Sequence, residues 1–238
     1  MKTKQVMKLI NIPNIITCCN LLCGCLSIFC GFHGDIDWAC LYIVAGAVFD
    51  FFDGMTARAL HISGPIGKEL DSLADVVSFG IAPSVLCYNI VLTVGGSETL
   101  ALFSFIMAAF SALRLAKFNC DERQTTSFIG LPTPANALFW IGLTYVIQLP
   151  MFGFLHNAYL ILALMVILSY LLISEVPMFS LKIKPGHMGF GENVVRYSFL
   201  AATVALIVGF ALIGQVQASP AVIILLYIVL SAASAKKQ

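Results

Sequence analysis

The chain has 238 residues, of which 60% are hydrophobic and only 11% are charged, with a mean hydropathy of +0.95 and a formal net charge of +1. Soluble domains carry about 25% charged residues, so this composition excludes an ordinary water-soluble fold and indicates an integral membrane protein. The near-neutral charge and the lack of a basic arm give no reason to expect nucleic-acid binding.

Apolar segments long enough to cross a bilayer recur along the whole chain. A spanning helix needs about 20 apolar residues, and short polar stretches such as "HGDID" and "GQVQAS" separate the segments. The expected helices cover residues 13–31, 38–60, 72–94, 98–116, 132–150, 154–174, 196–214 and 218–235. The sequence therefore predicts an all-α fold, a polytopic transmembrane bundle of about eight spans in one domain over residues 1–238.

The first expected helix follows three lysines, as the apolar core of a signal peptide would. It is long, however, and polar residues interrupt it. Thr17, Asn20, Gly24 and Ser27 share one helical face. We therefore expect a retained helix whose polar face points into the bundle.

Basic residues mark one side of the membrane. With the N-terminus inside, all thirteen Lys and Arg residues fall in inner segments or within about a turn of them, and the four outer loops contain none. The positive-inside rule then places both termini in the cytoplasm, with the protein in the inner (cytoplasmic) membrane. The segment 175–195 mixes lysines with large apolar residues and is expected to lie along the inner surface.

The eight cysteines do not suggest a disulfide framework or a zinc site. Five of them lie within the first apolar run, and no histidines accompany them at zinc spacing. We expect small, apolar packing residues.

Four aspartates stand at the inner ends of the second and third expected helices. Asp50 and Asp53 share a narrow arc of one helix, and Asp71 and Asp75 share an arc of the next. Small or polar residues lie on the same two faces: Gly54, Ala57, Gly67 and Ser78. Glycine and alanine leave room for a ligand between the carboxylates.

Four facing anions repel one another unless a cation neutralises them. Hard oxygen ligands without His or Cys favour Mg²⁺, Mn²⁺ or Ca²⁺. Four carboxylates suffice for two such ions, a pair suited to clamping a diphosphate. Arg58, one turn further on, offers a fork of donors for phosphate.

Two other interpretations remain open at this point. The aspartates can be ordinary helix-end carboxylates, solvated or paired with Arg58 and Lys68. They can also bind a passing ion in a cation transporter or channel, although they gather at the inner edge and not at the membrane midplane.

The same residues spell D-x-x-D-G-x-x-A-R, eight residues, then G-x-x-x-D-x-x-x-D, between Asp50 and Asp75. This pattern resembles the signature of the CDP-alcohol phosphatidyltransferases at every position. The resemblance implies an enzyme that moves a phosphatidyl group from CDP-diacylglycerol to an alcohol and releases CMP. It also implies a divalent-metal cofactor, Mg²⁺ or Mn²⁺ and two ions, and a homodimer in the lipid bilayer.

The resemblance further implies roles for individual residues. Asp50, Asp53 and Asp71 are expected to be metal ligands, and Asp75 is expected to complete the metal site and act as general base. The residues expected to bind CDP-diacylglycerol are Asn14, Thr17, Gly54, Ala57, Arg58 and Gly67. The motifs lie within residues 12–137, and the helices over 154–238 are additions to this core.

Further stretches, among them "DSLADVVSFGIAPS" at 71–84 and "GLPTPANA" at 130–137, resemble the phosphatidylserine synthase branch of the family. This branch uses L-serine as the acceptor, where other branches use glycerol 3-phosphate or inositol phosphate. A zwitterion needs a cation and several acceptors. The candidate serine-binding residues are Ser78, Arg114, Lys117 and Asn119, although Arg114 and Lys117 also suit simple positive-inside anchors.

Overall fold

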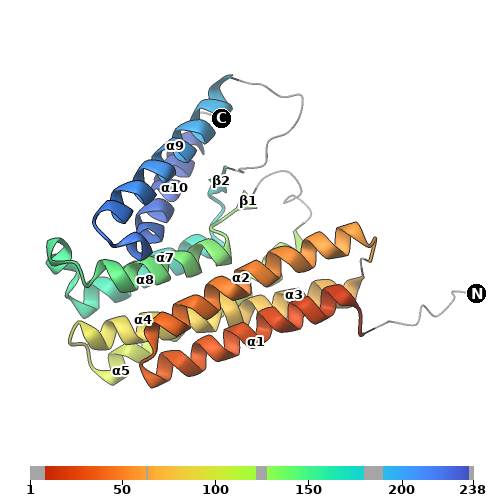
Figure 1. The fold of residues 1–238 in the computed structure, drawn as a ribbon, viewed down its shortest axis with the longest axis horizontal. Coiled ribbons are helices and arrows are strands. Elements are labelled where there is room, and N and C mark those ends of the chain that lie inside the picture. Colours follow the sequence, from red (N-terminus) through yellow and green to blue (C-terminus); the bar gives the residue numbers. More distant parts are fainter. Residues whose placement is uncertain (1–8, 63, 122–127, 180–189, 236–238) are drawn as a thin grey trace, which may run out of the picture.

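Helices dominate the part of the chain that the computed structural model describes, residues 9–62, 64–121, 128–179 and 190–235 (Figure 1). The α-helices are α1 (Ile12–His33), α2 (Ile36–Ala59), α3 (Pro65–Asp75), α4 (Ala82–Thr93), α5 (Glu98–Ala101), α6 (Ile106–Cys120), α7 (Thr133–Val146), α8 (Ala158–Ile173), α9 (Phe190–Leu212) and α10 (Ser219–Ala235). A π-helix, η1 (Val76–Ile81), and the 3₁₀ segments η2 (Leu102–Phe105), η4 (Pro150–Leu155) and η5 (Val216–Ala218) link them.

Six helical stretches of the described residues are long and apolar enough to cross a membrane. Two of them are composite, since α3, η1 and α4 run on as Pro65–Thr93, and α5, η2 and α6 as Glu98–Cys120. The other four are α1, α2, most of α9 (Val195–Leu212) and Val216–Ser234. The chain is therefore a multi-pass membrane protein, and the prediction of a helical membrane bundle is confirmed.

The segments expected to span at 132–150 and 154–174 are shorter helices than the sequence suggested. α7 has 14 residues and α8 has 16, which is about 21 and 24 Å at 1.5 Å per residue, against a hydrocarbon core of about 30 Å. Pro150, which lacks a backbone donor, begins a 3₁₀ segment between them. A helix thus lies at each of the eight expected positions, but six stretches reach spanning length.

The α1–α2 hairpin has clear local signals at both of its ends. Asn11 caps α1 by accepting a hydrogen bond from the backbone N–H of Asn14 at 2.9 Å. Gly34 ends the helix with a φ of 84°, a left-handed conformation that favours glycine. α2 then begins two residues later and runs back along α1 (Figure 1).

The polar face of α1 is buried between α2 and the composite α3–η1–α4 helix. The Ser27 hydroxyl donates to the backbone carbonyl of Ala39 on α2 at 2.8 Å. The backbones approach so closely at Gly24 that a Cβ there would lie 2.5 Å from Ser78 Oγ on η1. Small residues on this face therefore set the distance between the three helices that carry the site.

The rest of the bundle is held by an apolar core around α7 and α8. Trp140 and Phe139 of α7 and Ile161 and Met165 of α8 are fully buried in it. β1 (Phe128–Ile129) and β2 (Pro177–Met178) pair antiparallel beside this core. α9 and α10 lie together beside α7 (Figure 1). Only 6% of the apolar stretch Val195–Leu212 of α9 is buried within the protein, which suits contact with lipid.

The cysteines form no disulfide. All eight are free, and they are spread over α1, α2, α4 and α6. Cys23, Cys40 and Cys87 are buried, as expected of packing residues, whereas Cys18, Cys25 and Cys120 are exposed on the surface of the bundle.

Candidate active site

Three of the four aspartates come together where the end of α2 meets the start of α3. Carboxylate oxygens of Asp50, Asp53 and Asp71 all lie within 4.8 Å of one another. Asp53 is only 5% exposed and Asp75, one turn beyond Asp71 on α3, is 7% exposed. Two antiparallel helices joined by a short connection therefore turn their carboxylates toward one shared space.

α1 supplies the third wall of this space and holds one carboxylate of each neighbouring helix. The Thr17 hydroxyl donates to Asp53 Oδ2 at 2.6 Å, and the Asn20 amide donates to Asp75 Oδ1 at 3.2 Å. The two donors are three residues apart, so they lie one above the other on the same helical face. This polar face of α1 therefore orients the acidic site.

Asn20 belongs to the site as well. The sequence predicts that it lies on the polar face of the first helix, but gives it no role in the site. Its side chain is completely buried, and its Oδ1 has no hydrogen-bond partner in the described structure. A Cβ added to Gly46 of α2 would lie 2.9 Å from that oxygen. The Asn20 side chain thus packs between α2 and α3 beside the acidic site. Its position on the polar face of α1 was the sequence feature that could have identified it.

No basic side chain of the described residues lies within ion-pair distance of the four aspartates. Among the described residues the one ion pair joins Lys117 to Glu175, and none involves the four aspartates. Carboxylates held together in a poorly hydrated site repel one another strongly. A bound cation removes that repulsion.

The oxygens present fit a divalent ion of the hard class. Two ligands of one ion lie at most about twice the metal–oxygen distance apart, which is about 4.2 Å for Mg²⁺ and about 4.8 Å for Ca²⁺. The upper limit of 4.8 Å on the distances among the Asp50, Asp53 and Asp71 oxygens meets this condition for Ca²⁺, and oxygens at most about 0.6 Å closer meet it for Mg²⁺. All candidate ligands are carboxylates, which suits Mg²⁺ or Mn²⁺ better than zinc or copper.

Small residues keep the mouth of the cluster open at the end of the bundle where α2 ends and α3 begins. A Cβ on Gly54 would lie 3.4 Å from Nη1 of Arg58, so the guanidinium folds back over this glycine. A Cβ on Gly67 would lie 3.4 Å from Oδ1 of Asn14 on α1. Ala57 is half-buried on the same face of α2. Donors for phosphate and an amide thus border the space next to the carboxylates.

Of the four candidate serine-binding residues, Arg114 leaves most of its hydrogen-bond donors without an acceptor among the described residues. Its side chain is 7% exposed, donates to Thr133 Oγ1 over a long 3.4 Å and lies over the Phe118 ring at 5.3 Å. It also interacts electrostatically with Asp75. A buried guanidinium without a carboxylate in hydrogen-bond contact is suited to an anionic ligand.

The other three candidates are engaged within the protein. The Lys117 ammonium contacts Glu175 at 3.0 Å and the Ile173 carbonyl at 3.1 Å. The Asn119 amide donates to Ser72 Oγ at 2.9 Å. The fully buried Ser78 hydroxyl donates to the Asn20 backbone carbonyl at 2.9 Å. These contacts fasten α6 and η1 to their neighbours, which is a sufficient role for each.

Comparison with known proteins agrees with this geometry. Residues 10–176 match the family model described as CDP-alcohol phosphatidyltransferase. A CDP-diacylglycerol–serine O-phosphatidyltransferase of Bacillus subtilis (strain 168) is 38% identical over 69% of this chain and 88% of its own length. Proteins of the same description are 34% identical in Helicobacter pylori (strain 26695), over 69% of this chain and 70% of that one, and 36% identical in Methanocaldococcus jannaschii, over 72% and 75%.

The matched region contains the four aspartates, α1 with its polar face, and Arg114. The family model alone covers more than half of the chain. The chain belongs to the CDP-alcohol phosphatidyltransferase family.

Proposed function

We propose that the chain transfers the phosphatidyl group of CDP-diacylglycerol to L-serine and releases CMP. The observation that carries this proposal is the cluster of Asp50, Asp53 and Asp71 oxygens within 4.8 Å of one another, opening beside Arg58. The relatives that match most of the chain are described as enzymes of this reaction. Ion transport, the rival interpretation of buried carboxylates, has no such support.

The donor substrate is proposed to lie across the mouth of the cluster. Arg58 would pair with a phosphate oxygen of CDP, since a guanidinium fork matches phosphate geometry. Gly54, Ala57 and Gly67 would let the nucleotide approach the helix backbones, with Asn14 at its edge. Thr17, expected to contact the donor, instead donates to Asp53, so we propose that it orients this carboxylate.

A metal cofactor fits the acidic site. Asp50, Asp53 and Asp71, with Asp75 beside them, would hold Mg²⁺ or Mn²⁺, two ions in our proposal, and these would neutralise the diphosphate and the departing CMP. The protein's own part is to keep the four carboxylates in place through Thr17 and Asn20.

The reaction is a substitution at phosphorus. The serine hydroxyl oxygen bonds to the phosphorus that carries diacylglycerol, and the bond from that phosphorus to the CMP oxygen breaks with its electron pair. Asp75 accepts the hydroxyl proton as general base. Its Oδ1 already accepts from Asn20, which leaves Oδ2 for the proton.

The acceptor pocket is proposed to form around Arg114. Its guanidinium would bind the serine carboxylate, on the side of Asp75 where the hydroxyl must be placed. Thr133, which contacts Arg114 from the first turn of α7, would hold the guanidinium in position. We assign Lys117, Asn119 and Ser78 to structural contacts around this pocket.

The topology follows from the same proposal. With both termini in the cytoplasm, the acidic site faces the cytoplasm, where CTP-derived substrates and serine are found. We propose one membrane domain with about eight membrane-inserted helices, α7 and α8 being the short ones, in the inner membrane. A homodimer is also proposed, on the family resemblance.

Acceptor preference tests the proposed function. The purified chain is incubated with CDP-diacylglycerol, Mn²⁺ and one acceptor at a time, and CMP is measured. We expect rapid CMP release with L-serine and only background release with glycerol 3-phosphate or inositol. A faster reaction with either of the other alcohols would assign the chain to another branch of the family.

Replacing Arg114 tests the acceptor pocket. Arg114→Lys keeps a positive charge but loses the paired donors that match a carboxylate. We expect the KM for serine to rise about 10–100-fold, the loss of one or two charge-assisted hydrogen bonds, with the KM for CDP-diacylglycerol unchanged. The matched control, Arg58→Lys, should show the opposite pattern. An unchanged serine KM in Arg114→Lys would remove this arginine from the pocket.

A further inference from the structure

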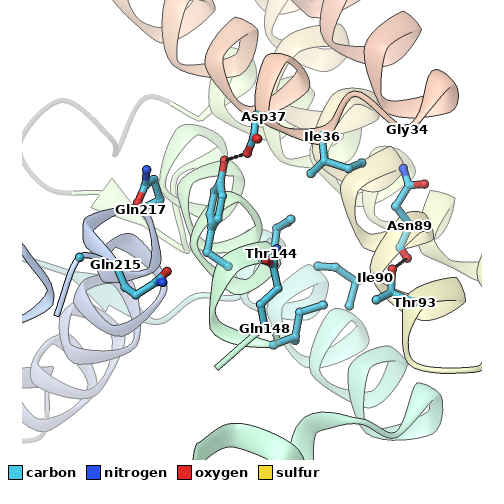
Figure 2. A pocket seen from close by; sticks show the side chains of 13 residues that line it. Gly34, Ile36, Asp37, Asn89, Ile90, Thr93, Thr144, Gln148, Gln215 and Gln217 are labelled. Atoms are coloured by element: carbon cyan, nitrogen blue, oxygen red, sulfur yellow. Dashed lines mark hydrogen bonds between the residues drawn. The ribbon is translucent and has the colours of Figure 1, made fainter. Parts of the chain in front are cut away.

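A second polar site lies at the opposite end of the bundle from the aspartates. It is a cavity of about 520 Å³ between the start of α2, the ends of α4 and α7, and the turn before α10 (Figure 2). Asp37 in this cavity and Asp53 in the acidic site are 16 residues apart on α2, which is about 24 Å along the helix axis. The cavity is therefore separate from the transfer chemistry.

Five side chains around the cavity, those of Asp37, Tyr145, Thr93, Thr144 and Asn89, have no hydrogen-bond donor left for a ligand. The Tyr145 hydroxyl donates to Asp37 Oδ1 at 2.8 Å, a bond visible in Figure 2. The Thr93 and Thr144 hydroxyls donate to backbone carbonyls one turn earlier in their helices. The Asn89 amide donates to two carbonyls, of Gly31 and Val85. What the side chains of Asp37, Tyr145, Thr93, Thr144 and Asn89 still offer to a ligand are acceptor oxygens, and the amides of Gln148, Gln215 and Gln217 add one oxygen acceptor each beside their N–H groups.

The charges around the cavity also favour a ligand that donates hydrogen bonds, and in particular a cation. Asp37 is the one charged residue of the lining, and no Lys or Arg is part of it. Asp35 and Glu98 add negative charge at the same end, where the connections between helices contain no basic residue. An anionic ligand such as a phosphate has no cation to meet here. Because one carboxylate is too few for a tightly held divalent metal ion, an organic cation fits better.

We propose that this cavity binds the ammonium group of a small amine or of an aminophospholipid head group. The Asp37 carboxylate would pair with the ammonium, and the Tyr145 ring would add a cation–π contact. The acceptor oxygens of Asn89 and Gln148 would take its remaining N–H donors, while Ile90 lines the cavity along the carbon chain. An ammonium has three donors and no acceptor, which matches the carboxylate of Asp37 and the acceptor oxygens around it.

Ethanolamine is the probe for this site. Its binding to the full chain in detergent is measured by calorimetry, beside ethylene glycol, which has the same size but no charge. We expect saturable one-to-one binding of ethanolamine and none of ethylene glycol. Asp37→Asn still accepts the Tyr145 bond but loses the charge, so it should weaken ethanolamine binding about tenfold or more.

The matched control is Glu98→Gln, which removes an acidic charge from the same end but not from the lining. It should leave ethanolamine affinity unchanged, and both variants should keep the serine-transfer rate, which shows that they fold. Equal weakening in the two variants, or no ethanolamine binding by the unmodified chain, would overturn the proposal.

A second experiment distinguishes a lipid head group from a free amine as the ligand of the cavity. The chain is placed in nanodiscs of phosphatidylglycerol with or without phosphatidylethanolamine, and ethanolamine binding is measured again. A lipid head group in the cavity would compete and weaken ethanolamine binding only in the discs with phosphatidylethanolamine. Unchanged binding would identify the ligand as a free amine.

Discussion

Replacement of Asp71 by alanine is expected to lower the rate of CMP release by about 10³-fold or more, since metal ions contribute several kcal/mol of charge stabilisation at phosphorus. Asp71 is the member of the cluster that α3 contributes, and its oxygens lie within 4.8 Å of those of Asp50 and Asp53. Its loss leaves Asp50 and Asp53 of α2 without the α3 carboxylate that lies within ligand distance of both. Asp50→Ala should have an effect of the same size.

Folding should survive this change. Removing one of several facing anions relieves repulsion, so the thermal unfolding temperature of Asp71→Ala should not fall. The control is Glu69→Ala, an exposed acidic residue on the same helix, which should keep full activity. An Asp71→Ala protein with more than about a tenth of normal activity would contradict a shared metal site.

Asp75→Asn should lower kcat by about 10²–10⁴-fold, the range for loss of a general base. The asparagine has nearly the same shape and can still accept the Asn20 hydrogen bond, so binding of CDP-diacylglycerol and of metal should stay close to normal. The change therefore separates proton transfer from substrate binding. Single-turnover CMP release and Mn²⁺ titration are the measurements.

Two further experiments test whether Asp75 acts as a base or as a metal ligand. Asn20→Ala removes only the donor that orients Asp75, and the loss of one hydrogen bond should cost about tenfold in kcat. If instead excess Mn²⁺ restores the rate of Asp75→Asn, Asp75 is a metal ligand and not the base.

Much of the fold was predictable because hydropathy reports directly on membrane insertion. A helix lies at each of the eight expected segments. The lengths of α7 and α8 were not predictable, because apolar loop residues around Pro150 look like continued helix in a hydropathy window. The π-helix that follows Asp75 was not predicted either, since a hydropathy pattern does not distinguish a π-helix from an α-helix.

The part of the acidic site that depends on residues close together in the sequence was predictable. Asp50 and Asp53 share a face because they are three residues apart, whatever surrounds them. The sequence could not predict that Arg114 and Lys117 have different roles, because both lie near the same end of α6. Their difference arises from a residue distant in the sequence, Glu175, which forms an ion pair with Lys117. Likewise, the cavity around Asp37 gathers residues from four separate segments.

The central claim is that the carboxylate cluster carries out phosphatidyl transfer to serine. The most direct measurement uses CDP-diacylglycerol with radioactive phosphorus in the phosphate that carries diacylglycerol, together with L-serine and Mn²⁺. We expect all of the consumed label to appear in phosphatidylserine, with one unlabelled CMP released for each lipid formed, and EDTA to stop both. CMP release without a serine-containing lipid, label in CMP, or turnover that persists in EDTA would contradict the central claim.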